Sequence, residues 1–281
     1  MSQPFFMLDY HSLSIDHPKL GQVAVIPWDT EIFGFPVGKY KIGDPEYLAL
    51  NQKIFHHSLM DWANSNNAEL ISVSAPADDF RTLSILRELG FHYVDCSLRA
   101  TLRRIQSMDF SAAPSSLRPA QPEDQESVEL LAAKIFNSGH YCADHRFPPA
   151  LAHKRFQQWL RNAFLFQSPG TYILVQGAPG NIKGFSHFER KGDLADIRIA
   201  GIDINSKSGI GRSGFTLYRD TIRAVKELGM KNAVAVVYAA NTAALNLHTT
   251  LGFRFSHSEA QLHWHSPHAP HLIDLKNGKL S

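Results

Sequence analysis

The order of apolar and polar positions from residue 195 to residue 238 predicts a strand, a helix and a second strand. Isoleucines are frequent in residues 195–204, and a β-branched run of this kind favours a strand. Apolar side chains then recur at helical spacing as far as Val225, and Gly229 is a suitable end for that helix. Residues 234–238, Val-Ala-Val-Val-Tyr, predict the second strand, which we expect to be buried.

A glycine-rich turn joins the first of these strands to the helix. Gly209 and Gly211 cannot extend a strand easily, because glycine favours turns. The first N–H groups of a helix converge on one point and carry partial positive charge, so such a turn suits a phosphate. Lys207 and Arg212 flank the turn and are suited to ionic contacts with a pyrophosphate. The alternative is an ordinary connection between a strand and a helix. The sequence lacks the residue spacing of nucleotide P-loops and of dinucleotide-binding loops, so neither of those sites is predicted.

A second helix is predicted between Asn241 and Gly252. Asn241 is a good capping residue, and glycine commonly ends a helix. His248 lies on the apolar stripe of this helix, four residues after Ala244. One interpretation of His248 is therefore a core histidine held by a hydrogen bond.

The first half of the chain repeats part of this pattern without the glycine turn. We expect a strand at 23–26, a helix at 47–64, a strand at 70–73, a helix after Asp78-Asp79 and a strand at 93–102. Residues 83–91 resemble residues 245–253, since both end in Leu-Gly-Phe, which indicates a weak internal repeat. Residues 107–116 are small and polar and predict a linker. The predicted domains are therefore 1–106 and 117–281.

Composition excludes several functional classes. The 281 residues are 44% hydrophobic with a net charge of +2, so neither a nucleic-acid surface nor a membrane surface is indicated. Two cysteines give no disulfide framework. No apolar run approaches the length of a membrane span, and the N-terminus lacks a signal-peptide pattern. We expect a cytoplasmic protein; a homodimer is one assembly that it could form.

These motifs together resemble the Gcn5-related N-acetyltransferase (GNAT) superfamily over residues 115–265. The residues shared with the family pattern are Gly209, Gly211, Asn241, Ala244, Gly252, Phe253, and the opening Arg118 to Asp124. The resemblance implies a tandem GNAT-like α/β (α+β) fold, with mixed, mostly antiparallel sheets flanked by helices. It also implies that the first half is a truncated copy, which does not bind CoA in the usual way.

The resemblance further implies acetyl-CoA as the co-substrate and a set of residues that bind it. Backbone N–H groups near Ile202 and Ile204 would polarise the thioester carbonyl. Ser206 departs from the family pattern, where Arg or Gln is usual. The expected donor-binding residues are Ile202, Asp203, Ile204, Lys207, Ser208, Gly209, Ile210, Gly211, Arg212, Ser213 and Asn241.

The resemblance places His248 where the family commonly has a tyrosine that protonates the leaving CoA sulfur. Imidazole titrates near pH 6.5, so histidine could perform the same step. For the general base we select Glu189, with His187, Asp196 and Asp203 as the other candidates. His187 and Glu189 are two residues apart on a predicted strand and so share one face.

Two segments are similar to the TDP-fucosamine N-acetyltransferases. Residues 28–36, Trp-Asp-Thr-Glu-Ile-Phe-Gly-Phe-Pro, form a predicted loop, for which a hydrophobic plug is the alternative interpretation. Residues 140–148 form a second loop, whose Tyr141, His145 and Arg146 would bind the acceptor; a surface loop is the alternative there. The expected acceptor is a small-molecule amine, best an amino sugar or a nucleotide-linked amino sugar. A protein lysine or N-terminus, and a non-catalytic CoA-binding role, are the alternatives.

The tail contains a cluster of four histidines. The cluster comprises His263, His265, His268 and His271. Such a group can hold zinc, but no cysteine or carboxylate is adjacent and two prolines interrupt it. The sequence therefore favours a solvated strand face and no metal site.

Overall fold

A computed structural model describes residues 8–110, 115–166, 169–203, 210–267, 273–274 and 279–280. The side chains of residues 210–213, 273–274 and 279–280 are not described. The chain forms two compact units. The first unit comprises Met1–Ser97, Gly139–Ala152 and Ser258–Ser281, and the second comprises Leu98–Ser138 and His153–His257.

The sheet of the first unit has the strand order β1-β2-β3-β4-β11. Strands β3 and β4 are parallel, whereas β11 pairs with β4 in the antiparallel sense, from Glu259↔Pro76 to His265↔Leu70. The strands are β1 (His11–Ser12), β2 (Gly21–Val25), β3 (Val37–Ile42), β4 (Leu70–Pro76) and β11 (Arg254–His265). A short pair, β12 (Ile273–Asp274) with β13 (Lys279–Leu280), follows.

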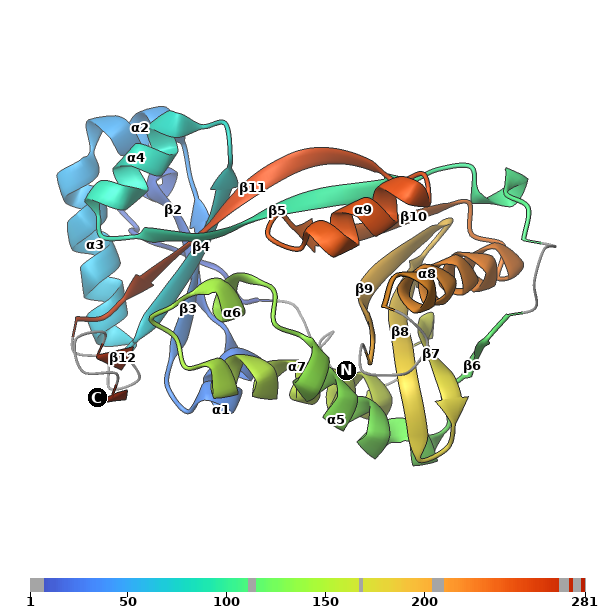
Figure 1. The fold of residues 1–281 in the computed structure, drawn as a ribbon. Helices are drawn as coiled ribbons and strands as arrows, with labels where there is room; N and C mark the ends of the chain where they lie inside the picture. Colours follow the sequence, from blue (N-terminus) through green and yellow to red (C-terminus); the bar gives the residue numbers. More distant parts are fainter. Residues whose placement is uncertain are drawn as a thin grey trace. The chain divides into compact units, whose positions relative to one another are not determined.

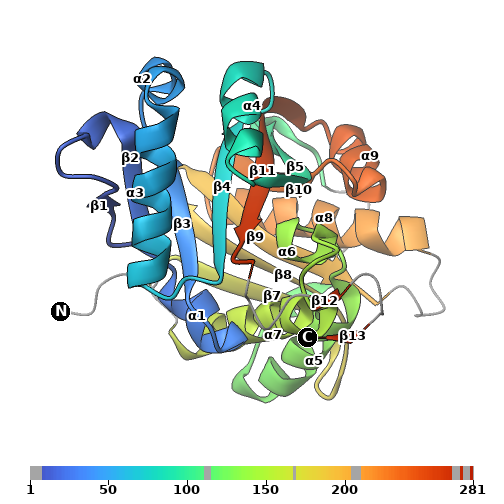
Figure 2. The same ribbon diagram turned by 90° about the vertical axis from the view of Figure 1, so that its left-hand side faces the viewer.

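Helices cover both faces of this sheet (Figures 1 and 2). One face packs against α2 (Pro45–Leu50), α3 (Gln52–Ser65) and α4 (Phe80–Glu88) around Phe55, Leu59 and Leu86. The other face packs against α1 (Pro27–Phe33) and the segment 139–152, which contains α6 (His140–Ala143). A 3-10 helix, η1 (Pro18–Leu20), precedes β2.

Two expectations for this unit were wrong. The helix expected at 47–64 is broken at Asn51 into α2 and α3. The loop expected at 28–36 contains α1, because Pro27 suits the first turn of a helix and Gly34 ends it with a φ of 81°. The sequence signals for this helix are the proline at its start and the glycine after its end. The loop was predicted because more weight was given to the aromatic residues of the segment.

The sheet of the second unit has the strand order β10-β9-β8-β7-β6. Helix α8 (Ile210–Glu227) packs on one face, and α5 (Gln125–Ile135) and α7 (Pro149–Leu165) supply the core of the other. The remaining elements are β6 (Leu117–Pro119), η3 (Pro122–Asp124), β7 (Thr171–Ala178), β8 (Asn181–Lys191), β9 (Leu194–Ile202), β10 (Asn232–Tyr238) and α9 (Thr242–Thr250).

Strands β5 (His92–Leu102) and β11 each begin in one unit and end in the other. The 3-10 helix η2 (Ile105–Ser107) follows β5. The compact units thus differ from the predicted domains, because residues 139–152 and the tail from Ser258 belong with the first unit.

The internal repeat has a structural counterpart: α4 and α9 are both followed by a glycine, Gly90 or Gly252, with a φ of 88°. None of the helices in the described ranges is both long and apolar enough to cross a membrane.

Candidate active site

Strands β9 and β10 run parallel for part of their length only. Their pairing extends from Leu194↔Asn232 to Ile197↔Ala235. Strand β9 nevertheless continues to Ile202, and β10 continues to Tyr238. The ends of these two parallel strands therefore lie outside the paired region, which leaves an opening between their backbones. Ile202, which the GNAT resemblance assigns to the thioester, ends β9 in this unpaired part.

A β-bulge marks the start of this opening. His187 pairs with Ile199 and Phe188 pairs with Ile197, so Arg198 is an extra residue on β9. Ile197 packs in the core beside α8, whereas Ile199 packs in the core beside α5 and α7. Residues two apart normally face the same side of a strand, so the bulge reverses the faces of β9.

Beyond the bulge, β9 passes close to α5. A Cβ atom on Gly201 would lie 2.5 Å from Ile135 Cδ1, so glycine permits this approach. Ile202 ends the strand, and the N–H of Asp203 donates to the carbonyl of Lys183 at 2.7 Å. The Asp203 carboxylate lies 3.4 Å from Lys134 Nζ, so this base candidate already has a cationic partner.

The predicted pyrophosphate turn lies mostly outside the described residues. This applies to Ile204, Lys207, Ser208 and Gly209. Ile210, Gly211, Arg212 and Ser213 form the start of α8. An eighteen-residue helix therefore begins where the sequence predicts that N–H groups meet a phosphate.

Asn241 caps α9 as predicted. Its Oδ1 accepts a hydrogen bond from the N–H of Ala244 at 3.0 Å, and its Nδ2 lies 3.4 Å from Ser138 Oγ. The side chain therefore fixes the start of α9 immediately after β10 ends.

His248 is buried inside the second unit. Its Nδ1 donates to the carbonyl of Ala244 at 2.8 Å, and its ring meets Tyr218 and Phe253 edge-on at 4.7 Å and 4.8 Å between ring centroids. Burial lowers its pKa, and Nε2 has no hydrogen-bond partner among the described residues. The imidazole is then neutral near pH 7 with its only proton on Nδ1, which favours the core role of this residue.

The base candidates Glu189 and His187 lie on β8, on either side of the bulge. Glu189 Oε1 is 3.7 Å from Arg198 Nε, and its side chain is 25% exposed. Asp196 is 2.6 Å from Lys191 Nζ and 3.2 Å from an Arg198 nitrogen. His187 is only 2% exposed, and neither ring nitrogen has a hydrogen-bond partner in the described part of the chain.

Burial, followed by the nearby Arg198 charge, lowers the pKa of His187 to about 4, although Asp196 opposes the shift. An unfolded histidine takes up its proton near pH 6.5, so between these values the unfolded state binds more protons than the folded state. Stability should therefore fall as the pH drops from about 6.5 toward 4. For His187 alone the loss between pH 7.5 and 4.5 is about 2.5 kcal/mol.

Urea unfolding of the wild type and of His187→Leu at both pH values measures this effect. The wild type should lose about 2.5 kcal/mol more than the variant over that interval. Equal losses in the two proteins would show that His187 does not carry the difference.

The predicted acceptor residues Tyr141, His145 and Arg146 belong to the first unit, whereas the predicted donor residues belong to the second. Tyr141 is buried against Phe33 and Phe147, and its hydroxyl donates to Asp29 Oδ2 at 2.8 Å. His145 is exposed and Arg146 is half-buried. Tyr141 thus anchors the segment, and the other two side chains remain accessible.

The expectation of a solvated histidine face in the tail was wrong. His263 and His265 are buried, with fully covered side chains, and both contact the buried carboxylate of Asp144. Burial alone would raise the pKa of Asp144, but hydrogen bonds from His263, His265 and His92 hold it well below its usual range. The alternating pattern of the tail could not indicate Asp144, because Asp144 lies 119 residues away from His263 in the sequence. The other two histidines, His268 and His271, lie outside the described residues.

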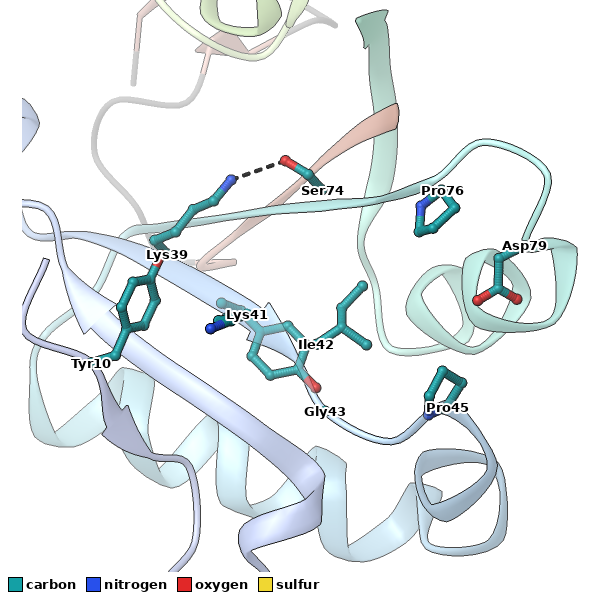
Figure 3. A pocket seen from close by; sticks show the side chains of 10 residues that line it. Tyr10, Lys39, Lys41, Ile42, Gly43, Pro45, Ser74, Pro76 and Asp79 are labelled. Atoms are coloured by element: carbon teal, nitrogen blue, oxygen red, sulfur yellow. Dashed lines mark hydrogen bonds between the residues drawn. The ribbon is translucent and has the colours of Figure 1, made fainter. Parts of the chain in front are cut away.

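A pocket of about 370 Å³ lies at the ends of the parallel strands β3 and β4 in the first unit (Figure 3). Lys39 hydrogen-bonds Ser74 at 3.1 Å across it. Two helices begin beside this pocket, but Asp44 already accepts the first N–H groups of α2, and Asp79 accepts one of α4. These carboxylates occupy the amides that a phosphate would need. The pocket is lined by Tyr10, Lys39, Tyr40, Lys41, Ile42, Gly43, Pro45, Ser74, Pro76 and Asp79.

Solved structures with a similar fold confirm the predicted fold class. A GCN5-related N-acetyltransferase from Sphaerobacter thermophilus has a TM-score of 0.58 and 13% identity, over 88% of this chain and 76% of its own. A functionally unknown conserved protein from Staphylococcus epidermidis has a TM-score of 0.61 and 12% identity, over 93% and 96%. A tandem GNAT protein from the clavulanic acid biosynthesis pathway, solved without AcCoA, has a TM-score of 0.54 and 12% identity, over 88% and 79%.

At these identities the similarity establishes the fold alone. No family model matches the sequence, and no curated protein matches it. The chain therefore has a tandem GNAT-like fold of mixed sheets flanked by helices, and any activity has to be argued from its residues.

Proposed function

We propose that the chain is an N-acetyltransferase that moves an acetyl group from acetyl-CoA to a primary amine. The observation that carries this proposal is the opening between β9 and β10, which begins at the bulge of Arg198. Helix α8 begins just after β9, and the Asn241-capped helix α9 begins just after β10. Two helix N-termini thus follow the two strand ends that bound the opening.

The donor would bind with its pyrophosphate at the start of α8 and its thioester along β9. The pairing between β9 and β10 ends at Ile197. Beyond that residue, the N–H groups of β9 that face β10 do not pair with it, so they are suited to donating to the thioester carbonyl and polarising it. The neutral amine then attacks the carbonyl carbon, the C–S bond breaks, and the sulfur leaves as the CoA thiolate. The thiolate takes up the proton that the nitrogen loses as the amide forms. No covalent intermediate on the enzyme is required.

Glu189 is our choice for the base that takes the proton from the acceptor ammonium. Its side chain is 25% exposed, it lies near the bulge, and its contact with the cationic Arg198 is long, at 3.7 Å. The side chains of Asp196 and Asp203 are less exposed and lie closer to lysines, at 2.6 Å and 3.4 Å, and His187 is buried.

The acceptor class that we favour is an amino sugar, free or linked to a nucleotide, in a cytoplasmic reaction. The support is the residue pattern at 28–36 and 140–148, together with the accessible His145 and half-buried Arg146, which suit hydroxyl and diphosphate groups. The direct experiment incubates the protein with acetyl-CoA and a panel of amines, and it measures release of the CoA thiol and the mass of the product. Acetylation of amino sugars but not of lysine peptides is expected; no thiol release with any amine would contradict the proposal.

Gly211→Val should weaken acetyl-CoA binding by at least tenfold, because a branched side chain at the second position of α8 would obstruct the approach of the pyrophosphate. Isothermal titration calorimetry of the folded variant measures this effect. Gly214→Ala is the matched control, since a Cβ atom there meets no heavy atom within 4 Å. Undiminished affinity in Gly211→Val would remove the pyrophosphate from this turn.

A further inference from the structure

Three histidines contact one carboxylate in the first unit, and a fourth contacts one of these three. Asp144, which follows α6, has both carboxylate oxygens in contact with imidazoles. His263 Nδ1 and His265 Nε2 each lie 2.7 Å from Oδ2, and His92 Nε2 lies 3.3 Å from Oδ1. His140 Nδ1 in turn lies 2.7 Å from His263 Nε2. The side chains of Asp144, His263 and His265 are fully buried, whereas that of His92 is 24% exposed.

We propose that His92, Asp144 and His265 form a binding site for a zinc-class divalent cation. One ligand atom from each residue lies within 4.8 Å of the other two. Bonds of 2.0–2.1 Å to a tetrahedral ion place ligand atoms about 3.3 Å apart, so the His92–Asp144 contact already has this spacing. His265 Nε2 now lies 2.7 Å from the other oxygen, Oδ2, so this ring would give up that contact when it joins the ligand set.

The donor set determines the class of ion. Two imidazole nitrogens and one carboxylate oxygen suit zinc and its transition-metal neighbours, whereas calcium and magnesium prefer oxygen ligands throughout. Without an ion, Nε2 of His92 and of His265 carries the proton and donates to Asp144. To bind the ion through Nε2, each ring gives up the proton on Nε2 and takes the neutral form protonated on Nδ1. For His92 this requires the Arg146 guanidinium, which now lies 3.4 Å from Nδ1, to turn away.

The surroundings of Asp144 hold its carboxylate in position. His263 Nδ1–H donates to Oδ2, and the backbone N–H of Arg146 donates to Oδ1 at 2.9 Å. Partners of this kind orient a ligating carboxylate and tune its affinity.

The site would join three segments that are distant in the sequence. His92 starts β5, His265 ends β11, and Asp144 lies in the segment 139–152. That segment also carries Tyr141, His145 and Arg146, so a bound ion would fix the predicted acceptor segment to the sheet of its own unit. This inference does not depend on the proposed acetyl transfer, and its test does not require turnover.

The test uses the full chain, free of any affinity tag and treated with a chelator before the metal is returned. Calorimetry with zinc sulfate should give one ion per chain, and Co²⁺ should give the visible absorption bands of a four-coordinate site. At a zinc concentration of about 100 times Kd, the Tm should rise by about 5–10 °C. Failure of the chelated, folded wild type to take up either ion would overturn the site.

His92→Gln and Asp144→Asn should each weaken zinc binding by more than about 100-fold. His92 is the safer variant for folding, because it is the exposed member of the group. His145→Gln is the matched control: its ring centroid is 6.3 Å from that of His92, but it supplies no ligand atom. Wild-type affinity in His92→Gln, or an equal loss in His145→Gln, would overturn the assignment.

Discussion

Replacing Glu189 with glutamine is expected to lower kcat/KM by about 10²–10⁴-fold, the usual contribution of a positioned general base. Glutamine keeps the size of the side chain but cannot accept the proton of the acceptor ammonium. The affinity for acetyl-CoA should hardly change, because the carboxylate takes a proton from the acceptor amine and is not proposed to contact the donor. Steady-state kinetics and calorimetry on the same variant measure both quantities.

The pH dependence separates a base from a structural residue. Without the carboxylate, the reaction depends on amine that is already deprotonated in solution, so Glu189→Gln should regain activity as the pH rises. Asp193→Asn is the control for a general charge effect, because Asp193 forms an exposed pair with Lys231 at 2.7 Å. If Glu189→Gln retained wild-type kcat/KM, Glu189 would not be the base.

Replacing His248 with alanine is expected to destabilise the second unit by roughly 3 kcal/mol, as truncation of a buried ring does. The ring fills the space between Tyr218 and Phe253, and its Nδ1–H satisfies the carbonyl of Ala244. A change of this size lowers Tm by about 6–12 °C in a unit of this length. Turnover of the folded fraction should stay within about threefold of wild type, because a neutral imidazole with a lowered pKa has little acid to offer at pH 7.

His248→Phe distinguishes packing from proton transfer. Phenylalanine restores the ring but has no nitrogen, so it should recover much of the lost Tm while turnover remains normal. Measurements of Tm and of the turnover rate on both variants are needed together. If both variants instead turned over about 100-fold more slowly than wild type, His248 would be the proton donor that the GNAT resemblance implies.

The helix ends were the most predictable part of the fold, because their signals are local. Asn241 and Asp79 accept hydrogen bonds from the first turns of α9 and α4, as their positions in the sequence indicate. Arg118 and Asp124, the opening pair of the GNAT pattern, form a two-point ion pair with contacts of 2.7 Å and 2.8 Å. Such features depend on residues only a few positions apart.

The features that the sequence could not reveal depend on pairing between distant residues. The bulge at Arg198 is visible only against the partner strand β8, because the isoleucines on either side alternate as they would in a regular strand. The histidine cluster requires that β5, β11 and the segment 139–152 meet at Asp144. His92 and Asp144 are unremarkable in their local sequence, so no local signal could have found them.

The discontinuity of the first unit governs the order in which the protein can fold during synthesis. Strand β4 pairs with β11, which leaves the ribosome only after all of the second unit has been made. The second unit ends at His257, so its residues are all available while the first unit still lacks a strand. Domains usually fold from the N-terminus onward during translation, but here the unit that begins the chain must be finished last. For the same reason, the two units cannot be exchanged between genes by a single crossover.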